Sequence, residues 1–439
     1  VMMTYDEAVS FIKEISKSGS ILGLENIENL MNELGNVENE LNIIHIAGTN
    51  GKGSVGAYLE SVFMECGFSV ARYCSPAVFT PLEIMTYNRI NISKDEYADV
   101  VSQVKRACDI MVSGNMSMPT AFEVETAAAF VWFASKKPDI VLLETGMGGL
   151  EDATNVIKSP MASVITTISK DHMKFLGDTV EEIAKAKAGI IKPDSMVFCA
   201  YQKKSVLNVI SDKAKKCNCE FYSVELEKEK LIDISPGKLV FEYPVEGENV
   251  KFETKMSGEY QIHNASLAAL ITSKILINKY GFTKSDTIKH IKKGIENASW
   301  PGRFETISKN PLVIIDGAHN EGAAIELKAT LEKSFTNTKL TYIIGVLADK
   351  VHEKMLKLLL PLADKVFTIT PSNIRGLSGE KLKEEALRYH NNVEYCENVR
   401  QAVDKAILTG NTVIAFGSLS YLGELKQIVK SNIIQKDRK

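Results

Sequence analysis

The sequence lacks several features that would assign it to a common class of protein. No uncharged apolar run approaches the ~18 residues that a membrane-spanning helix needs. The seven cysteines form no CxxC pair, and their odd number indicates reduced thiols rather than a disulfide framework. The formal net charge of -3 provides no basic surface for general nucleic-acid binding.

The beginning of the sequence also lacks the pattern of a secretory signal peptide. Residues 1–6 contain no basic segment followed by an apolar one. We therefore expect a cytoplasmic protein that binds neither nucleic acid nor membrane. We also expect a monomer whose partners are small molecules.

What the sequence does contain is an alternation of short apolar runs with segments of helical spacing. Residues 41–47, 139–143 and 162–167 are rich in Ile, Val or Leu and predict buried strands. Residues 121–135 and 179–191 carry the spacing of helices. Strands that alternate with helices predict an α/β fold with a mostly parallel sheet flanked by helices on both faces.

Length and punctuation divide this α/β chain into two domains. A chain of 439 residues is too long for one compact core. Pro301 and Gly302 interrupt the pattern, and a second strand–helix series begins at residues 311–315. We predict an N-terminal domain over residues 1–299 and a smaller, Rossmann-like α/β domain over residues 300–439.

A glycine-rich segment directly follows the predicted strand at residues 41–47. It comprises Gly48, Thr49, Asn50, Gly51, Lys52, Gly53 and Ser54, and a helix is expected from Val55. A strand, a glycine-rich loop and a helix N-terminus together form a cradle of backbone N–H groups for phosphate. Lys52 is placed to reach the outer phosphates, and Ser54 is placed to offer its hydroxyl to Mg²⁺. The N-terminal domain is therefore predicted to be a P-loop domain that binds a nucleotide.

The spacing of this segment, GxxGKGS, is shorter than the common GxxxxGK[ST] pattern. A glycine-rich turn that contains lysine by chance is the alternative interpretation. The loop by itself does not separate a ligase from a GTPase, a kinase or a motor.

Three polar residues from separate segments indicate a metal site near the loop. Glu144 follows one predicted strand and His172 follows the next, so both lie at the sheet edge where open α/β sheets bind ligands. Thr179 and Glu182 form a capping box that starts a helix. The apolar face of this helix includes Lys187, and a buried ammonium is costly unless it is paired or modified. Each residue also has a structural alternative: a helix cap for Glu144, a buried structural role for His172, and snorkelling along apolar surface for Lys187.

These segments resemble those of a known family. Residues 45–54 are similar to the phosphate loop of folylpolyglutamate and dihydrofolate synthases, which belong to the Mur ligase superfamily. The resemblance continues in the same order along almost the whole chain, at residues 122–123, 144–155, 171–172, 187–190, 263–265, 300–303, 316–320 and 416–419. It implies an ATP-dependent amide ligase that adds L-glutamate to a folate. It also allows for action on dihydropteroate, the dihydrofolate synthase reaction.

The resemblance implies roles for individual residues. Two Mg²⁺ ions would be held by Ser54, Glu144, His172 and Lys187, the last as its carbamate, whose oxygen atoms suit Mg²⁺. The catalytic residues would be Lys52, Glu144, His172 and Lys187. ATP would be contacted by the glycine-rich loop and by Asn264, Arg303, Asp316 and His319. The folate would lie near Ser75, Pro76 and Asp152, and the incoming glutamate near Ser418.

Two segments depart from the family pattern. Ser75-Pro76 is followed by Ala77, where His or an aromatic residue is common, and the later Glu-Arg pair is replaced by Asn88-Arg89. Leu150 stands where Arg is frequent. Both departures fall in the part that would hold the folate, so a Mur-type ligase for another carboxylate acceptor stays open. A nucleotide-dependent switch without ligase activity is the alternative from another class.

Amide formation requires activation because a carboxylate is a poor electrophile. The resemblance implies that the γ-phosphoryl group of ATP is transferred to the folate carboxylate and that the glutamate amine then attacks the resulting acyl phosphate. ATP contacts on both domains imply that the domains close before the chemical step.

Overall fold

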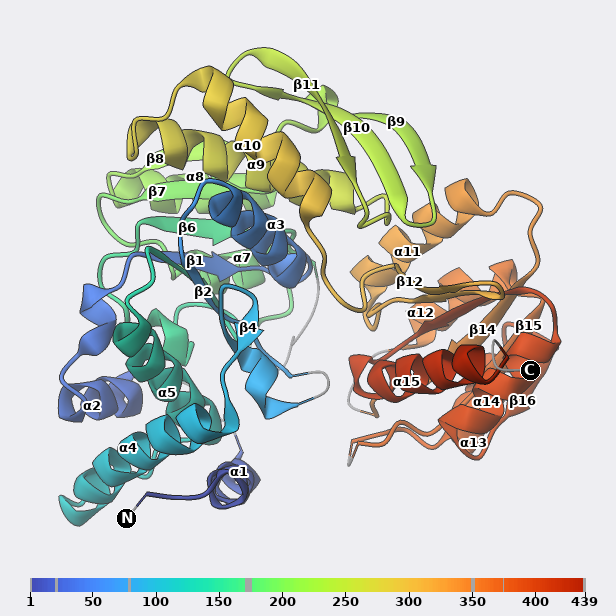
Figure 1. The fold of residues 1–439 in the computed structure, drawn as a ribbon, viewed down its shortest axis with the longest axis horizontal. Coiled ribbons are helices and arrows are strands. Elements are labelled where there is room, and N and C mark those ends of the chain that lie inside the picture. Colours follow the sequence, from blue (N-terminus) through green and yellow to red (C-terminus); the bar gives the residue numbers. More distant parts are fainter. Residues whose placement is uncertain are drawn as a thin grey trace. The chain divides into compact units, whose positions relative to one another are not determined.

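The computed structural model describes residues 2–19, 23–77, 80–169, 176–348, 352–373 and 375–436 (Figure 1). The chain forms two compact units. The first consists of Val1–Lys228, Pro244–Glu248 and His263–Ile295, and the second of Glu229–Tyr243, Asn249–Ile262 and Glu296–Lys439. The predicted α/β class is confirmed in both units, and the single boundary at residue 300 remains a prediction.

The first unit is built on an eight-stranded sheet with the order β4-β3-β2-β5-β1-β6-β7-β8. The strands from β2 to β8 in this order are parallel, whereas β3 and β4 are antiparallel at one edge. The strands are β1 (Ile43–Ala47), β2 (Val70–Tyr73), β3 (Met85–Tyr87), β4 (Ile90–Asn91), β5 (Ile140–Glu144), β6 (Ala162–Ile165), β7 (Met196–Cys199) and β8 (Glu220–Ser223). The strands predicted at residues 41–47, 139–143 and 162–167 are thus confirmed as β1, β5 and β6, with slightly shifted ends.

Helices cover this sheet on both faces. Ile43 and Ile44 point to opposite faces of β1, and both are buried. The helices are α1 (Tyr5–Ile15), α2 (Glu25–Glu33), α3 (Lys52–Glu65), α4 (Lys94–Ser113), α5 (Ala121–Lys136), α7 (Val180–Ala188), α8 (Lys204–Lys216), α9 (Gln261–Asn278) and α10 (Lys284–Asn297). On one face, Ile43 shares an apolar core with α4 and α5, and Ala47 shares one with α7 and α8. On the opposite face, α3 packs against β1, β2 and β5, and its Gly56 lies against Arg72 of β2.

The second unit contains a six-stranded sheet with the order β12-β13-β17-β14-β15-β16. β12 is antiparallel to β13, and the other pairs are parallel. The strands are β12 (Glu305–Lys309), β13 (Leu312–Ile315), β14 (Leu340–Ile344), β15 (Lys365–Thr368), β16 (Val393–Tyr395) and β17 (Thr412–Phe416). The helices are α11 (Glu321–Ser334), α12 (Glu353–Leu359), α13 (Gly379–Ala386), α14 (Val399–Leu408) and α15 (Leu419–Lys436). Apolar clusters occupy both faces of this sheet.

A third, three-stranded sheet consists of β9 (Lys230–Ser235), β10 (Lys238–Val245) and β11 (Glu248–Thr254). All seven cysteines are free thiols, as predicted. Among the described helices, none combines the length and the apolar character that crossing a lipid bilayer requires.

Candidate active site

The glycine-rich loop connects the central strand β1 to α3. Because β5 and β6 flank β1, the loop lies between the carboxyl ends of two neighbouring strands, where open α/β sheets bind ligands. Gly51 has φ +87° directly before α3, a left-handed conformation that glycine adopts at little cost. Gly48 lies so close to Thr166 that a Cβ atom would overlap the threonine hydroxyl. The predicted strand–loop–helix arrangement is confirmed, with the helix beginning at Lys52, earlier than expected.

The segment after β6 holds the glycine-rich loop in place. The carbonyl oxygen of Thr167 accepts hydrogen bonds from the amides of Thr49 at 2.9 Å and Asn50 at 3.2 Å. The Thr166 hydroxyl donates to the Asn50 carbonyl oxygen at 2.7 Å. The Thr49 hydroxyl donates to the Ser169 carbonyl oxygen at 3.0 Å. The conformation of the loop is therefore set by hydrogen bonds to the segment that follows β6.

Two lysine ammonium groups meet at one carbonyl oxygen of this loop. Lys52 Nζ donates to Gly48 O at 3.0 Å, and Lys187 Nζ donates to the same oxygen at 2.9 Å. Lys187 is only 4% exposed, so its ammonium does not snorkel to solvent. Two positive charges beside a cradle of backbone N–H groups favour an anionic ligand.

α7 presents Lys187 to the loop through its apolar face. The side chain of Thr179 accepts from the amide of Glu182, so the predicted capping box is confirmed. Ile183, Lys187 and their apolar neighbours on this face are buried, whereas Lys185 is exposed. The sequence pattern therefore distinguished the two lysines correctly.

Besides Lys187, Glu144 and Ser54 are the described members of the predicted metal site. Glu144 ends β5, and Ser54 lies in the first turn of α3, which packs against β5. Their exposed fractions are 7% and 1%. His172 lies outside the described residues. Within the part of the chain that the structure describes, no three His, Cys, Asp or Glu side chains are grouped to suit a metal ion, so the ligand set remains a prediction.

A cavity of about 30 Å³ lies between the glycine-rich loop and the loop that follows β5. It is lined by Gly48, Thr49, Lys52, Gly146, Met147, Gly148, Leu176 and Lys187. This volume holds one or two water molecules. The cavity brings the two lysines together with backbone from the ends of β1 and β5.

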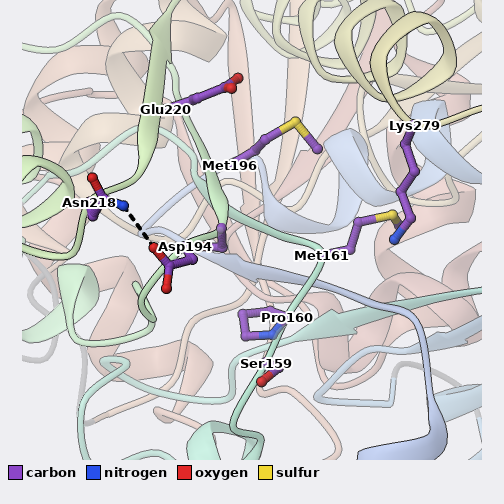
Figure 2. Close-up of a pocket in the computed structure, with 9 residues that line it drawn as sticks. Ser159, Pro160, Met161, Asp194, Met196, Asn218, Glu220 and Lys279 are labelled. Atoms are coloured by element: carbon purple, nitrogen blue, oxygen red, sulfur yellow. Dashed lines mark hydrogen bonds between the residues drawn. The ribbon is translucent and has the colours of Figure 1, made fainter.

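A larger cavity of about 540 Å³ opens at the opposite edge of the same sheet, where β6, β7 and β8 begin. Figure 2 shows Asp194, Asn218, Glu220 and Lys279 around it, with Asn218 donating to Asp194 Oδ1 at 2.8 Å. None of the residues predicted for the site lines this cavity. The candidate active site is therefore the edge that carries the glycine-rich loop.

Asp152 is hydrogen-bonded to the loop that follows β5. Its carboxylate is 4% exposed and accepts hydrogen bonds from the amides of Met147 at 2.7 Å and Thr154 at 3.1 Å. Burial raises the pKa of Asp152, and these hydrogen bonds oppose that rise. The observed contacts of Asp152 hold the backbone next to the cavity.

Ser75 and Pro76 follow β2 at the same edge of the sheet, because β2 is parallel to β5. Ser75 is half-buried and Pro76 is exposed. The ring of Phe122 lies 6.2 Å from that of Tyr73, the last residue of β2, and a Cβ atom on Gly146 would meet the same Phe122 ring. Phe122 thus joins the end of β2 to the loop after β5.

Asn264, at the start of α9, reaches the glycine-rich loop. A Cβ atom on Gly51 would lie 2.5 Å from Asn264 Oδ1. The structure therefore places this predicted ATP contact beside the loop.

In the second unit, Asp316 organises the loop that follows β13. Its Oδ2 atom accepts from the Tyr260 hydroxyl at 2.9 Å and from the amide of Phe304 at 2.9 Å. Its Oδ1 atom accepts from the amide of Ala318 at 2.8 Å. The amide of Phe304 directly follows Arg303, so Asp316 also holds the segment that carries this arginine.

The other candidates of the second unit lie at the same end of its sheet. His319 Nδ1 lies 2.8 Å from Gly317 O. Gly417, next to Ser418, donates its amide to Ala318 O at 2.8 Å. The hydroxyl of Ser418 lies 2.8 Å from that of Ser420 in the first turn of α15. Loops after the neighbouring strands β13 and β17 therefore meet, and both carry predicted site residues.

Comparison with known proteins assigns this arrangement to a family. Residues 46–272 match the Mur ligase middle domain, and residues 302–419 match the Mur ligase glutamate ligase domain. The chain is 32% identical to the dihydrofolate synthase/folylpolyglutamate synthase of Bacillus subtilis, over 97% of this chain and 99% of that protein. The chain belongs to the folylpolyglutamate synthase/dihydrofolate synthase family of Mur ligases. It is also 29% identical to the folylpolyglutamate synthase of Lacticaseibacillus casei, over 94% of this chain and 97% of that protein.

Solved structures agree with this membership in the Mur ligases. The folylpolyglutamate synthase of Mycobacterium tuberculosis complexed with ADP has a TM-score of 0.87 and 27% identity, covering 97% of this chain and 98% of that one. The folylpolyglutamate synthase of Thermotoga maritima has a TM-score of 0.84 and 30% identity, covering 98% and 97%. The chain is thus an ATP-dependent ligase, and the alternative of a switch without ligase activity is set aside.

Several residues of this Mur ligase site were missed by sequence reasoning. Thr166 and Thr167 hold the glycine-rich loop, and Tyr260 binds Asp316. The two threonines are the last residues of the strand predicted at residues 162–167, next to the loop, which was a usable signal. Tyr260 has no local pattern that connects it with a residue so distant in the sequence.

Proposed function

We propose that this ligase joins L-glutamate to the carboxylate of a folate, with ATP hydrolysed to ADP and phosphate. The observation that carries the proposal is the meeting of Lys52 and Lys187 at Gly48 O, in a chain that matches a dihydrofolate synthase/folylpolyglutamate synthase over nearly its full length. The Lys52 ammonium beside a phosphate cradle suits a reaction that moves a phosphoryl group onto a carboxylate.

ATP is the nucleotide in this proposal. Its phosphates bind to the loop from Gly48 to Ser54, and Asn264 lies next to Gly51 in the same unit. From the second unit, Arg303, Asp316 and His319 contribute further contacts. The support for these three is that Asp316 accepts hydrogen bonds from two amides beside the other candidates. One is the amide of Phe304, next to Arg303, and the other is that of Ala318, next to His319.

We further propose that Ser54, Glu144, His172 and carbamylated Lys187 hold Mg²⁺. A hydroxyl, a carboxylate and a carbamate are hard oxygen donors of the kind that Mg²⁺ prefers. Lys187 as an ammonium cannot bind a cation, so the fit requires its modification by CO₂. When bound, Mg²⁺ neutralises negative charge on the phosphates.

The reaction takes two steps. The folate carboxylate attacks the γ-phosphorus of ATP, which forms an acyl phosphate and releases ADP. The glutamate amine then attacks the acyl carbon, the C–O bond to phosphate breaks, and inorganic phosphate and a proton leave. Lys52 stabilises charge on the transferring phosphoryl group. The backbone cradle of the glycine-rich loop holds the same group in position.

The folate side of the site is proposed at Ser75, Pro76 and Asp152, and the glutamate side at Ser418. The support is that Ser75 and the loop held by Asp152 lie at one edge of the first sheet. Closure of the two units before chemistry remains part of the proposal, and small-angle scattering with and without ATP and folate tests it.

The deciding experiment is a panel of ADP-release assays with Mg²⁺, ATP and L-glutamate. We expect turnover with tetrahydrofolate as acceptor, and dihydropteroate tests the dihydrofolate synthase activity. Turnover with UDP-muramyl peptides as the only active acceptor would show that the enzyme is a Mur ligase for another carboxylate. ADP release without any need for glutamate would contradict a ligase.

The carbamate has its own test. Lys187→Ala should be inactive, and short-chain carboxylic acids should restore part of the activity by supplying the missing oxygen ligand. Lys185→Ala, on the exposed face of the same helix, is the matched control and should retain activity. Full activity of Lys187→Ala would remove this residue from the site.

We also propose a cytoplasmic monomer. The support is the set of seven free cysteines, which suits a reducing compartment. Sedimentation equilibrium of the purified protein tests the monomer, and cell fractionation tests the location.

A further inference from the structure

A buried histidine with no role assigned above lies on the central strand of the first sheet. His45 belongs to β1 and is fully buried. Its Nε2 atom lies 2.8 Å from the hydroxyl oxygen of Thr154. Its other ring nitrogen, Nδ1, has no hydrogen-bond partner among the described residues.

Thr154 continues this contact to the cavity beside the glycine-rich loop. Its hydroxyl is 2.5 Å from Asp152 Oδ1, and its amide donates to the same oxygen at 3.1 Å. The second oxygen of Asp152 accepts from the amide of Met147 at 2.7 Å. Met147 lines the cavity together with Lys52 and Lys187. One hydrogen-bonded chain therefore runs from the sheet core to the site.

The unpartnered Nδ1 atom of His45 decides which group donates and which accepts in each hydrogen bond of this chain. If Nδ1 of His45 carried the proton, a buried N–H would have no acceptor, which is rarer and costlier than a bare acceptor nitrogen. The proton therefore sits on Nε2 and is donated to Thr154. The Thr154 hydroxyl then donates to Asp152, which is left as a carboxylate that accepts from three donors.

The ring stays neutral in this arrangement. Burial is the larger cause, and the charge of Lys192 the smaller one, that lowers the pKa of His45 from 6.5 to about 3. At neutral pH the ring therefore carries a proton on Nε2 and none on Nδ1. The chain of hydrogen bonds does not change its proton pattern while the enzyme works.

We propose that His45 and Thr154 are positioning residues, which orient Asp152 so that the Met147–Gly148 backbone faces the reacting groups between Lys52 and Lys187. This inference rests on the proposed ligase function. The glycine-rich loop itself is held by other contacts, to Thr166 and Thr167. Loss of the chain should therefore slow the chemical step without weakening ATP binding.

Thr154→Val and Thr154→Ser form the test pair. Valine keeps the shape and removes the hydroxyl, whereas serine keeps the hydroxyl. We expect Thr154→Val to lower kcat by about 10- to 100-fold, since small misplacements of reacting groups have effects of this size, and to leave KM for ATP within threefold. Thr154→Ser should restore kcat to within threefold of the unmodified enzyme.

Thr272→Val is the matched control. Thr272 is fully buried on α9, and its hydroxyl donates to carbonyl oxygens of its own helix. Its replacement makes the same chemical change and should leave kcat unaltered. His45→Leu and His45→Gln repeat the comparison at the other end of the chain, because glutamine retains an N–H donor near the Nε2 position.

A spectroscopic measurement checks the proton positions. The ¹⁵N shifts of His45, assigned by loss of its signal in His45→Gln, should be those of a neutral ring protonated on Nε2. A ring protonated on Nδ1, or unchanged kcat in both Thr154→Val and His45→Leu, would overturn the inference. Absence of glutamate-dependent turnover in the unmodified protein would instead overturn the proposed function, so the two failures are distinguishable.

Discussion

Replacement of Tyr260 by Phe tests how the second unit holds Asp316. The Tyr260 hydroxyl donates to Asp316 Oδ2 at 2.9 Å, and Asp316 is 3% exposed. Tyr260→Phe leaves the carboxylate with the amides of Phe304 and Ala318. A hydrogen bond to a charged group contributes about 1.5–3 kcal/mol, so we expect this unit to lose about 2 kcal/mol of unfolding free energy. Its melting temperature should fall by about 4–8 °C.

Tyr342 provides a matched control in the same unit. Its side chain is fully buried, and its hydroxyl has no hydrogen-bond partner among the described residues. Tyr342→Phe makes the same chemical change without removing a hydrogen bond. Because a buried polar atom without a partner is unfavourable, stability should stay constant or rise slightly.

The assay must report on one unit, because a chain of two units need not unfold in a single step. Hydrogen exchange at increasing urea concentrations, read on peptides that cover β13 and β17, isolates the sheet next to Asp316. KM for ATP should also rise in Tyr260→Phe, since Asp316 holds the segment of Arg303. Equal stability of Tyr260→Phe and Tyr342→Phe would refute the reasoning.

Four further predictions concern the first unit and its ligands. Lys52→Ala should lower ADP release by at least about 100-fold with an unchanged far-UV circular dichroism spectrum; substantial turnover would contradict the role of this lysine. Gly51→Ala should weaken ATP binding about tenfold in calorimetry, because φ is +87° and the added Cβ would lie 2.5 Å from Asn264 Oδ1. EDTA should stop ADP release and Mg²⁺ should restore it, so activity that persists in EDTA would count against the metal. Burial raises the pKa of Glu125 from 4.5 to about 7, so the folded state holds this proton up to a higher pH than the unfolded state does. Stability should therefore fall as the pH rises from 4.5 to about 7. Glu125→Gln should remove this loss and gain up to about 3 kcal/mol at pH 8 in urea unfolding; equal pH dependence of both proteins would contradict it.

Features that depend on a few adjacent residues were predictable from the sequence. The glycine-rich loop is a continuous segment after a run of buried apolar residues, and it forms between β1 and α3 as expected. The capping box at Thr179 and the spacing of Ile183 and Lys187 determine which side of α7 is buried. Local spacing suffices in such cases because hydrogen bonds and periodicity within one element involve only near neighbours.

The order of the strands was not available from local spacing. Nothing near Glu144 indicates that β5 lies between β1 and β2, yet this order places Glu144, Ser75 and the glycine-rich loop at one edge of the sheet. Asn264 beside Gly51 is a further contact of this kind. Strand order results from the packing of all helices on the sheet, so it depends on the whole chain.

The sequence alone determined which residues carry the phosphate loop, which lysine of α7 is buried, and the family to which they point. Only the tertiary structure decided that Lys52 and Lys187 share the carbonyl oxygen of Gly48, and that His45 is linked through Thr154 to the neighbouring loop. The physical reason is that the spacing of residues within one segment predicts its secondary structure and the face on which each side chain lies. The hydrogen bonds of buried polar groups are made with whichever distant segments packing brings within reach.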